Sequence, residues 1–156
     1  MTAPDESGAQ RSATPDGRAG PAVTRVVVDA ANVIGSRPDG WWRDRAGAAR
    51  RFAGELVALL VERREILAEA VGADGELVVH LVLEGAAGRV VDLPTHPQLQ
   101  VHRAPADGDS AIPALAGELD GDVVVVTADR GLRARVGAVG ARVTGPATLL
   151  GALPDP

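Results

Sequence analysis

The sequence of 156 residues contains no lysine, no cysteine and no tyrosine, and it has only one Met and one Phe. The absence of lysine excludes a P-loop, a Schiff-base enzyme and a receiver-type phosphorylation site, which all depend on that side chain. The absence of cysteine excludes disulfide scaffolds, thiolate zinc sites and cysteine nucleophiles. No apolar run reaches the roughly 18–20 residues of a membrane span, and residues 1–22 lack the apolar centre of a secretory signal. We therefore expect a cytoplasmic protein without membrane association.

The charge balance is acidic, with 16 Lys+Arg against 21 Asp+Glu and a net charge of −5. Such a balance argues against a passive nucleic-acid coat, which is normally basic, but it is compatible with an enzyme that collects metal ions. Two stretches are locally basic: residues 37–51 hold five Arg against two Asp, and residues 130–142 hold four Arg and no acid. Each stretch is either a solvated helix face or a rim that grips phosphate through the bidentate Arg fork.

The pattern of apolar residues divides the chain into a tail and one domain. Residues 1–22 are rich in Pro, Gly, Ser and Asp without periodicity, so we expect a disordered tail followed by a domain over residues 23–153. Buried strands alternate with amphipathic helices, which predicts an α/β fold with a parallel sheet covered on both faces. The predicted strands are 24–28, 76–83, 99–102, 122–127 and 141–144, and the predicted helices are 44–71, 109–119, 130–139 and 146–153.

An acidic residue follows each of the first four predicted strands: Asp29, Glu84, Asp109 and Asp129. In parallel sheets, ligands bind outside the carboxyl ends of the strands, near the point where the strand order reverses. A pair of carboxylates 4 Å apart costs about 4 kcal/mol at an effective dielectric of about 20, so protonation, Arg pairing or bound cations must offset the repulsion. Mg²⁺ or Mn²⁺ suits an all-oxygen site, and two such ions form the usual clamp for phosphodiester hydrolysis.

Each acid also has a simpler interpretation. Asp109 and Asp129 precede helices and are each equally well read as an N-cap, and Glu84 before a glycine is often an ordinary loop residue. Asp29 is harder to explain in this way, because an acid directly after a buried strand is costly without a partner.

Other polar and aromatic residues near these acids also leave alternatives open. Asn32 either shapes a turn or orients Asp29 or a phosphate, and Thr127 is either a strand residue or a hydroxyl that holds a water near the metal. The tryptophans at 41 and 42 either pack the loop onto the domain or stack on bases, the latter worth about 1–3 kcal/mol per base. The three histidines, at 80, 96 and 102, fit no metal motif, and we expect structural roles for them.

Four segments together resemble the NYN/YacP-like branch of the PIN-like nuclease superfamily: VVVDAANVIGSRPDGWWRDRAGAARR, LVLEG, DGDSAI and VVVVTADRGLRARVGAVGARVTGP. The resemblance covers about residues 24–153, and D-x-x-N and T-x-D-R-G-L are its most specific parts. It implies a parallel sheet of order 3-2-1-4-5 with a metal-dependent ribonuclease site at its carboxyl edge. It also implies that Asp29, Asp109 and Asp129 are the metal-site acids, with Asn32 and Glu84 at positions where relatives carry polar or acidic residues. Relatives often have a second acid where this chain has Ser110.

The leading hypothesis is a Mg²⁺- or Mn²⁺-dependent RNA endonuclease. Asp29, Asp109 and Asp129 would bind the metal, and Glu84 would be an auxiliary ligand or orient the water. The predicted substrate-binding residues are Asn32, Arg37, Arg43, Arg45, Thr127 and Arg130, with the arginines on phosphates. Candidate substrates are ribosome-associated RNA, tRNA and rRNA, and a homodimer is compatible with the sequence.

Three other functions remain open from the sequence. Ser110 in place of an acid favours a non-catalytic RNA-binding protein that retains the fold. A toxin ribonuclease of a toxin–antitoxin pair shares the same superfamily fold. A phosphatase with an aspartyl-phosphate intermediate is disfavoured, because it would need a second acid where this chain has Ala31.

Overall fold

A computed structural model describes residues 22–105 and 108–155, except for the side chain of Asp109. The tail expected over residues 1–22 lies outside the described residues, except for Ala22. Short 3₁₀ turns occupy Trp41–Arg43 and Gly85–Arg89. The strands are β1 (Val23–Asp29), β2 (Glu76–Glu84), β3 (Leu99–Ala104), β4 (Asp122–Val126) and β5 (Arg142–Thr144). The helices are α1 (Ala30–Gly35), α2 (Arg45–Glu62), α3 (Arg64–Val71), α4 (Gly108–Glu118), α5 (Arg130–Ala138) and α6 (Pro146–Ala152).

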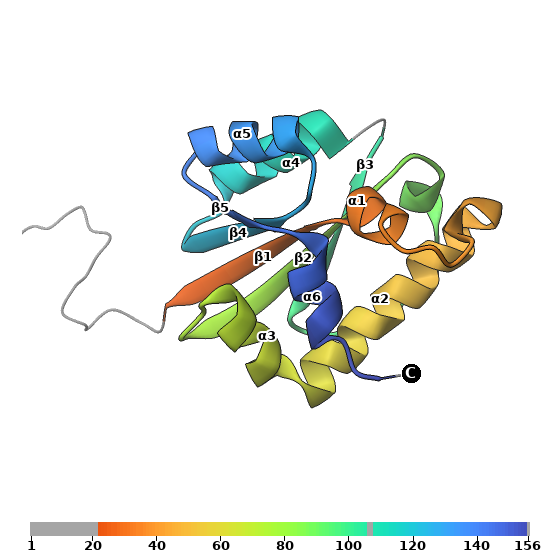
Figure 1. The fold of residues 1–156 in the computed structure, drawn as a ribbon, viewed down its shortest axis with the longest axis horizontal. Coiled ribbons are helices and arrows are strands. Elements are labelled where there is room, and N and C mark those ends of the chain that lie inside the picture. Colours follow the sequence, from red (N-terminus) through yellow and green to blue (C-terminus); the bar gives the residue numbers. More distant parts are fainter. Residues whose placement is uncertain (1–21, 106–107, 156) are drawn as a thin grey trace, which may run out of the picture.

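The five strands form one sheet in the order β3-β2-β1-β4-β5, and each neighbouring pair is parallel (Figure 1). This confirms the predicted α/β fold and strand order. The chain first builds outward from β1 through β2 to β3, and then returns to place β4 on the other side of β1. The order therefore reverses between β1 and β4, where Val28 lies in register with Val126.

Helices cover both faces of the sheet, as the continuous apolar strands predict. α1, α2, α3 and α6 lie on one face, and α4 and α5 lie on the other (Figure 1). Successive strand residues point to opposite faces, so Val26 and Val28 enter the larger core while Val27 enters the smaller one. In α2, Phe52 and Leu56 are buried at a spacing of four residues against the larger core.

The single helix predicted over residues 44–71 is wrong, because the chain forms two helices that meet at Arg63. The backbone of Arg63 has φ −138° and ψ 31°, outside the helical range. Its guanidinium Nη1 donates to the carbonyl oxygen of Leu153 at 3.0 Å, which fixes the break beside the end of α6. The predicted start is confirmed, since the Asp44 side chain accepts from the amide of Gly47 at 2.9 Å.

No helix in the described part of the chain is long and apolar enough to cross a membrane. The longest one, α2, carries charged residues along its length and packs one face on the sheet.

Candidate active site

Asp29 ends β1 at the carboxyl edge of the sheet, and only 7% of its surface is exposed. Its Oδ2 accepts a hydrogen bond from the hydroxyl of Thr127 at 2.9 Å. Its Oδ1 accepts from the backbone amide of Asn32 at 3.3 Å, so Asp29 is the N-cap of α1. A carboxylate in this position gains both hydrogen bonds and the favourable end of the helix dipole, which offsets the cost of its burial.

Thr127 connects the ends of the two central strands. It follows β4 and is fully buried, with an exposed fraction of 0%. While its hydroxyl donates to Asp29, the same oxygen accepts from the backbone amide of Asp129 at 3.2 Å. Its carbonyl oxygen accepts from Arg133 Nε at 3.0 Å. From its position just after β4, Thr127 thus holds the Asp29 carboxylate in a fixed orientation.

Asn32 reaches across from α1 to the turn that follows β4. Its Oδ1 accepts from the backbone amide of Ala128 at 2.7 Å. The turn then leads to Asp129, whose Oδ1 accepts from the amide of Leu132 at 3.0 Å and caps α5. The cap interpretation of Asp129 is therefore confirmed. A carboxylate has about four lone-pair sites, so this exposed cap retains capacity for another ligand.

Asp109, the third acid of the predicted metal site, has its backbone at the second position of α4. Its side chain lies outside what the structure describes, so the convergence of three acids stays a prediction. Among the described side chains, His, Cys, Asp and Glu form no group of three that could hold a metal ion. The described donors nearest the strand ends are carboxylate and hydroxyl oxygens, which is the donor type that Mg²⁺ takes. Ser110 is exposed in the same first turn of α4.

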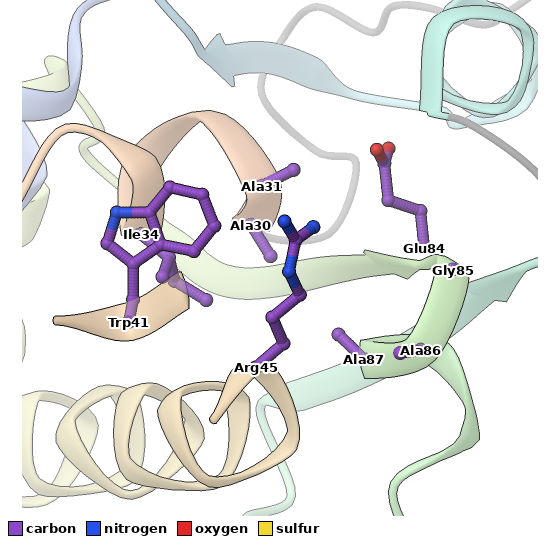
Figure 2. Close-up of a pocket in the computed structure, with 9 residues that line it drawn as sticks. All are labelled: Ala30, Ala31, Ile34, Trp41, Arg45, Glu84, Gly85, Ala86 and Ala87. Atoms are coloured by element: carbon purple, nitrogen blue, oxygen red, sulfur yellow. The ribbon is translucent and has the colours of Figure 1, made fainter. Parts of the chain in front are cut away.

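Glu84 is the last residue of β2, where it pairs with Ala104 of β3 and lines a cavity. The cavity has a volume of about 170 Å³ and is bounded by the start of α1, by Trp41 and Arg45, and by the turn after β2 (Figure 2). The Arg45 guanidinium lies over the Trp41 ring, with Cζ 5.2 Å from the ring centroid. The predicted phosphate ligand Arg45 and the predicted auxiliary acid Glu84 therefore face the same cavity.

The other predicted phosphate-binding arginines differ in their surroundings. Arg37 forms a bidentate ion pair with Glu55, with N–O distances of 2.7 and 2.9 Å. The hydrogen bond to Glu55 raises the pKa of the Arg37 guanidinium above its usual range. Arg43 lies over the Trp42 ring at 5.7 Å, and Arg130 is exposed at the first position of α5.

The two tryptophans differ in exposure, and this difference assigns loop packing to one and an exposed ring to the other. Trp41 is half-buried against the larger core, whereas Trp42 is 53% exposed. Their rings meet edge to face with centroids 5.9 Å apart. Trp41 therefore packs the loop onto the domain, and Trp42 presents an aromatic surface to solvent.

A histidine pair, formed by one buried and one half-buried ring, lies on the α4/α5 side of the sheet. His80 is fully buried, and its Nδ1 lies 2.9 Å from Nε2 of His102. Arg25 Nη1 lies 3.3 Å from His80 Nε2; because Arg can only donate, this nitrogen of His80 accepts. Burial, and to a smaller extent the charges of His102 and Arg25, together lower the pKa of His80 to about 4. His80 is thus neutral at pH 7, as a structural residue should be.

Comparison with known proteins supports the fold. The structure is similar to the crystal structure of a mutant of Rae1 (YacP) from Bacillus subtilis, with a TM-score of 0.55 and 18% sequence identity. The match covers 81% of this chain and 72% of that chain. No protein-family model matches the sequence, and no curated protein matches it either. The chain therefore has the YacP-like, NYN/PIN-like fold that its motifs predict.

Proposed function

We propose that this chain is a metal-dependent RNA endonuclease with its active site at the carboxyl ends of β1 and β4. The observation that carries the proposal is the buried carboxylate of Asp29, held by Thr127 at the point where the strand order reverses. Ligand sites of open parallel sheets lie at this point. A neutral Asn or Ser would also cap α1, so the cap alone does not require a carboxylate at this buried position.

The residues at this edge have distinct roles in the proposed reaction. Asp29, Asp109 and Asp129 would hold Mg²⁺ or Mn²⁺ through their carboxylate oxygens. Such an ion, when bound, lowers the pKa of the attacking water and stabilises the leaving oxygen. Thr127 fixes the orientation of Asp29, and Asn32 fixes the turn that presents Asp129. These two residues would act as positioning residues within the predicted substrate site.

Exposed arginines would bind the phosphates on either side of the cleaved bond. Arg43 and Arg45 precede or begin α2, and Arg130 begins α5, so they would approach the strand ends from two sides. Arg37 would have to exchange the Glu55 carboxylate for a phosphate. The proposed substrate is single-stranded or structured RNA, with ribosome-associated RNA, tRNA and rRNA as the candidates. Glu84 would orient the water or act as an auxiliary ligand.

Replacing Asp29 tests the proposal. We expect Asp29→Asn to lower the rate of Mn²⁺-dependent RNA cleavage at least about 100-fold, since even the residues behind a metal ligand typically contribute 10–100-fold. Asp74→Asn is the matched control: the same chemical change on an exposed residue before β2, at the opposite edge of the sheet. Thermal unfolding of both variants separates a lost catalytic group from a lost fold. Full cleavage by folded Asp29→Asn protein would exclude the proposed site.

One feature favours a second candidate, a non-catalytic RNA-binding protein. Ser110 stands in the first turn of α4, where relatives often carry a second acid, and fewer carboxylates mean weaker metal binding. Calorimetric titration of the full chain with Mn²⁺ distinguishes the two functions. Binding at millimolar metal or below favours the nuclease, whereas RNA binding without metal binding favours the second candidate.

A further inference from the structure

Two tryptophan–arginine pairs adjoin each other on the turn before α2. The Arg43 guanidinium lies over the Trp42 ring, with Cζ 5.7 Å from the ring centroid, and that of Arg45 lies over Trp41 at 5.2 Å. The two indoles meet edge to face with centroids 5.9 Å apart. Proteins that bind single-stranded nucleic acids combine such groups, because the rings stack on bases and the cations follow the phosphates.

The turn that carries Trp42 is held in place at both ends. Gly40 begins it with φ 81°, a left-handed conformation that favours glycine. Asp44 ends it: its amide donates to the carbonyl oxygen of Trp41 at 3.2 Å, and its side chain caps α2. Trp41 packs against the larger core. The exposed indole is therefore supported before any ligand arrives, which lowers the entropy cost of binding.

Trp42 and Arg43 both retain binding capacity. Trp42 is 53% exposed. Among the residues that the structure describes, the Arg43 side chain has no hydrogen bond and no ion pair, whereas Arg37 is bound to Glu55. A contact with a ring leaves the N–H donors of a guanidinium available for phosphate. The pair thus offers a stacking surface next to a phosphate ligand.

The surroundings of Trp42 fit a nucleic-acid strand better than a protein or membrane surface. Residues 37–51, all of which the structure describes, hold five Arg against two Asp, and one of these acids caps α2. Within the same residues, Trp42 is the only exposed large apolar side chain. Protein and membrane sites usually show a contiguous apolar patch, whereas one ring among cations suits a base and its phosphates.

This turn adjoins the candidate active site, since Trp41 lines the same cavity as Ala30, the residue after Asp29 (Figure 2). We propose that Trp42 stacks on an unpaired base of the RNA strand while Arg43 binds a neighbouring phosphate. The faces of paired bases are closed by their neighbours in a duplex, and sequence-specific proteins accordingly target unpaired bases. The proposal rests on the proposed function, because it takes RNA as the ligand, and it narrows the contacted part of the substrate to an unpaired strand.

Fluorescence anisotropy in EDTA and at constant salt tests the proposal without cleavage. The probes are a labelled RNA strand without internal complementarity, alone and paired with its complement. We expect Trp42→Leu to weaken binding of the single strand at least about fivefold, the lower bound for one stacked base, and to leave duplex binding unchanged. An equal loss for both probes, or no loss for either, would overturn the proposal.

Two further variants separate stacking from a general loss of apolar surface. Trp42→Phe keeps an aromatic face, so we expect it to retain most of the affinity that Trp42→Leu loses. Val61→Ala removes an exposed apolar side chain at the far end of α2 and should bind RNA like the unaltered chain. Thermal unfolding verifies that each variant is folded. If folded Trp42→Phe loses as much affinity as Trp42→Leu, ring stacking is not the contact and the proposal fails.

Tryptophan fluorescence locates the base. The chain has two Trp, so the Trp42→Phe protein reports on Trp41 alone. We expect the single strand to quench the unaltered chain and to have little effect on this variant; equal quenching would place the base at Trp41 and overturn the assignment. A response to phosphatidylserine vesicles but not to RNA would identify a membrane surface instead.

The outcome is distinguishable from that of the cleavage assay. A single-strand contact that depends on Trp42 stands even if the chain proves unable to cleave RNA, in which case only the nuclease is refuted. Metal-dependent cleavage with RNA binding that is insensitive to Trp42→Leu refutes the Trp42 assignment and leaves the nuclease intact.

Discussion

Replacing Thr127 by valine tests whether its hydroxyl holds the Asp29 carboxylate. The side chain keeps nearly the same shape, but Asp29 loses a donor at 2.9 Å and the Asp129 amide loses its acceptor at 3.2 Å. Hydrogen bonds to charged groups contribute about 1.5–3 kcal/mol. Because Thr127 is fully buried, we expect a loss of this size in the free energy of unfolding. For a domain of this length, each kcal/mol lowers Tm by about 4 °C, which predicts a decrease of about 6–12 °C.

Urea and thermal unfolding measure this loss, and Thr24→Val is the control. Thr24 is also buried, but its hydroxyl lies 3.4 Å from an oxygen of Asp122, a partly exposed carboxylate that Arg142 already binds at 2.6 Å. We expect the control to lose at most about 0.5 kcal/mol, because long hydrogen bonds are weak. If both variants lose the same amount, the Thr127 hydroxyl does not stabilise a buried charge and the reasoning fails.

Two other predictions concern titration and RNA affinity. Unfolded His80 gains a proton below about pH 6.5, but the folded residue does so only near its pKa of about 4; stability is therefore lost as the pH falls between these values. We expect about 2 kcal/mol less stability at pH 5 than at pH 7, measured by urea unfolding, and His80→Gln should reduce this pH dependence. Arg43→Gln should weaken RNA binding and lower the slope of log affinity against log salt by about 1. Arg37→Gln should change that slope less, because Arg37 already binds Glu55; equal slopes would contradict this difference.

The fold could be predicted from the sequence because its main signals are local. Runs such as the four valines of β4 are buried on both faces, and they can only be central strands of a covered sheet. The break at Arg63 could not be predicted, since apolar residues keep a helical spacing from α2 into α3. Ile66 continues that spacing and is nevertheless 43% exposed. The break is fixed instead by a contact with Leu153, which is distant in sequence.

The candidate site could be predicted only as a set of positions. The spacing of Asp29 and Asn32 places them on the first turn of α1, and the strand ends supply Asp129. Their partners come from across the sheet: Thr127 and Asp29 are 98 residues apart in the chain. The ion pair between Arg37 and Glu55 arises in the same way, because no local pattern identifies which acid a surface arginine meets.

The structure also changes the electrostatic argument for a metal. The sequence suggests that converging acids need a cation, Arg pairing or protonation, yet Asp29 and Asp129 are each satisfied by a helix N-terminus, and Asp29 also by Thr127. We therefore expect the fold not to depend on a metal, and chelation with EDTA to leave the unfolding transition cooperative. Mn²⁺ at a concentration equal to its dissociation constant should add only about 0.4 kcal/mol, or about 2 °C in Tm. Unfolding on chelation would show instead that a cation holds the strand ends together, and metal would then be structural as well as catalytic.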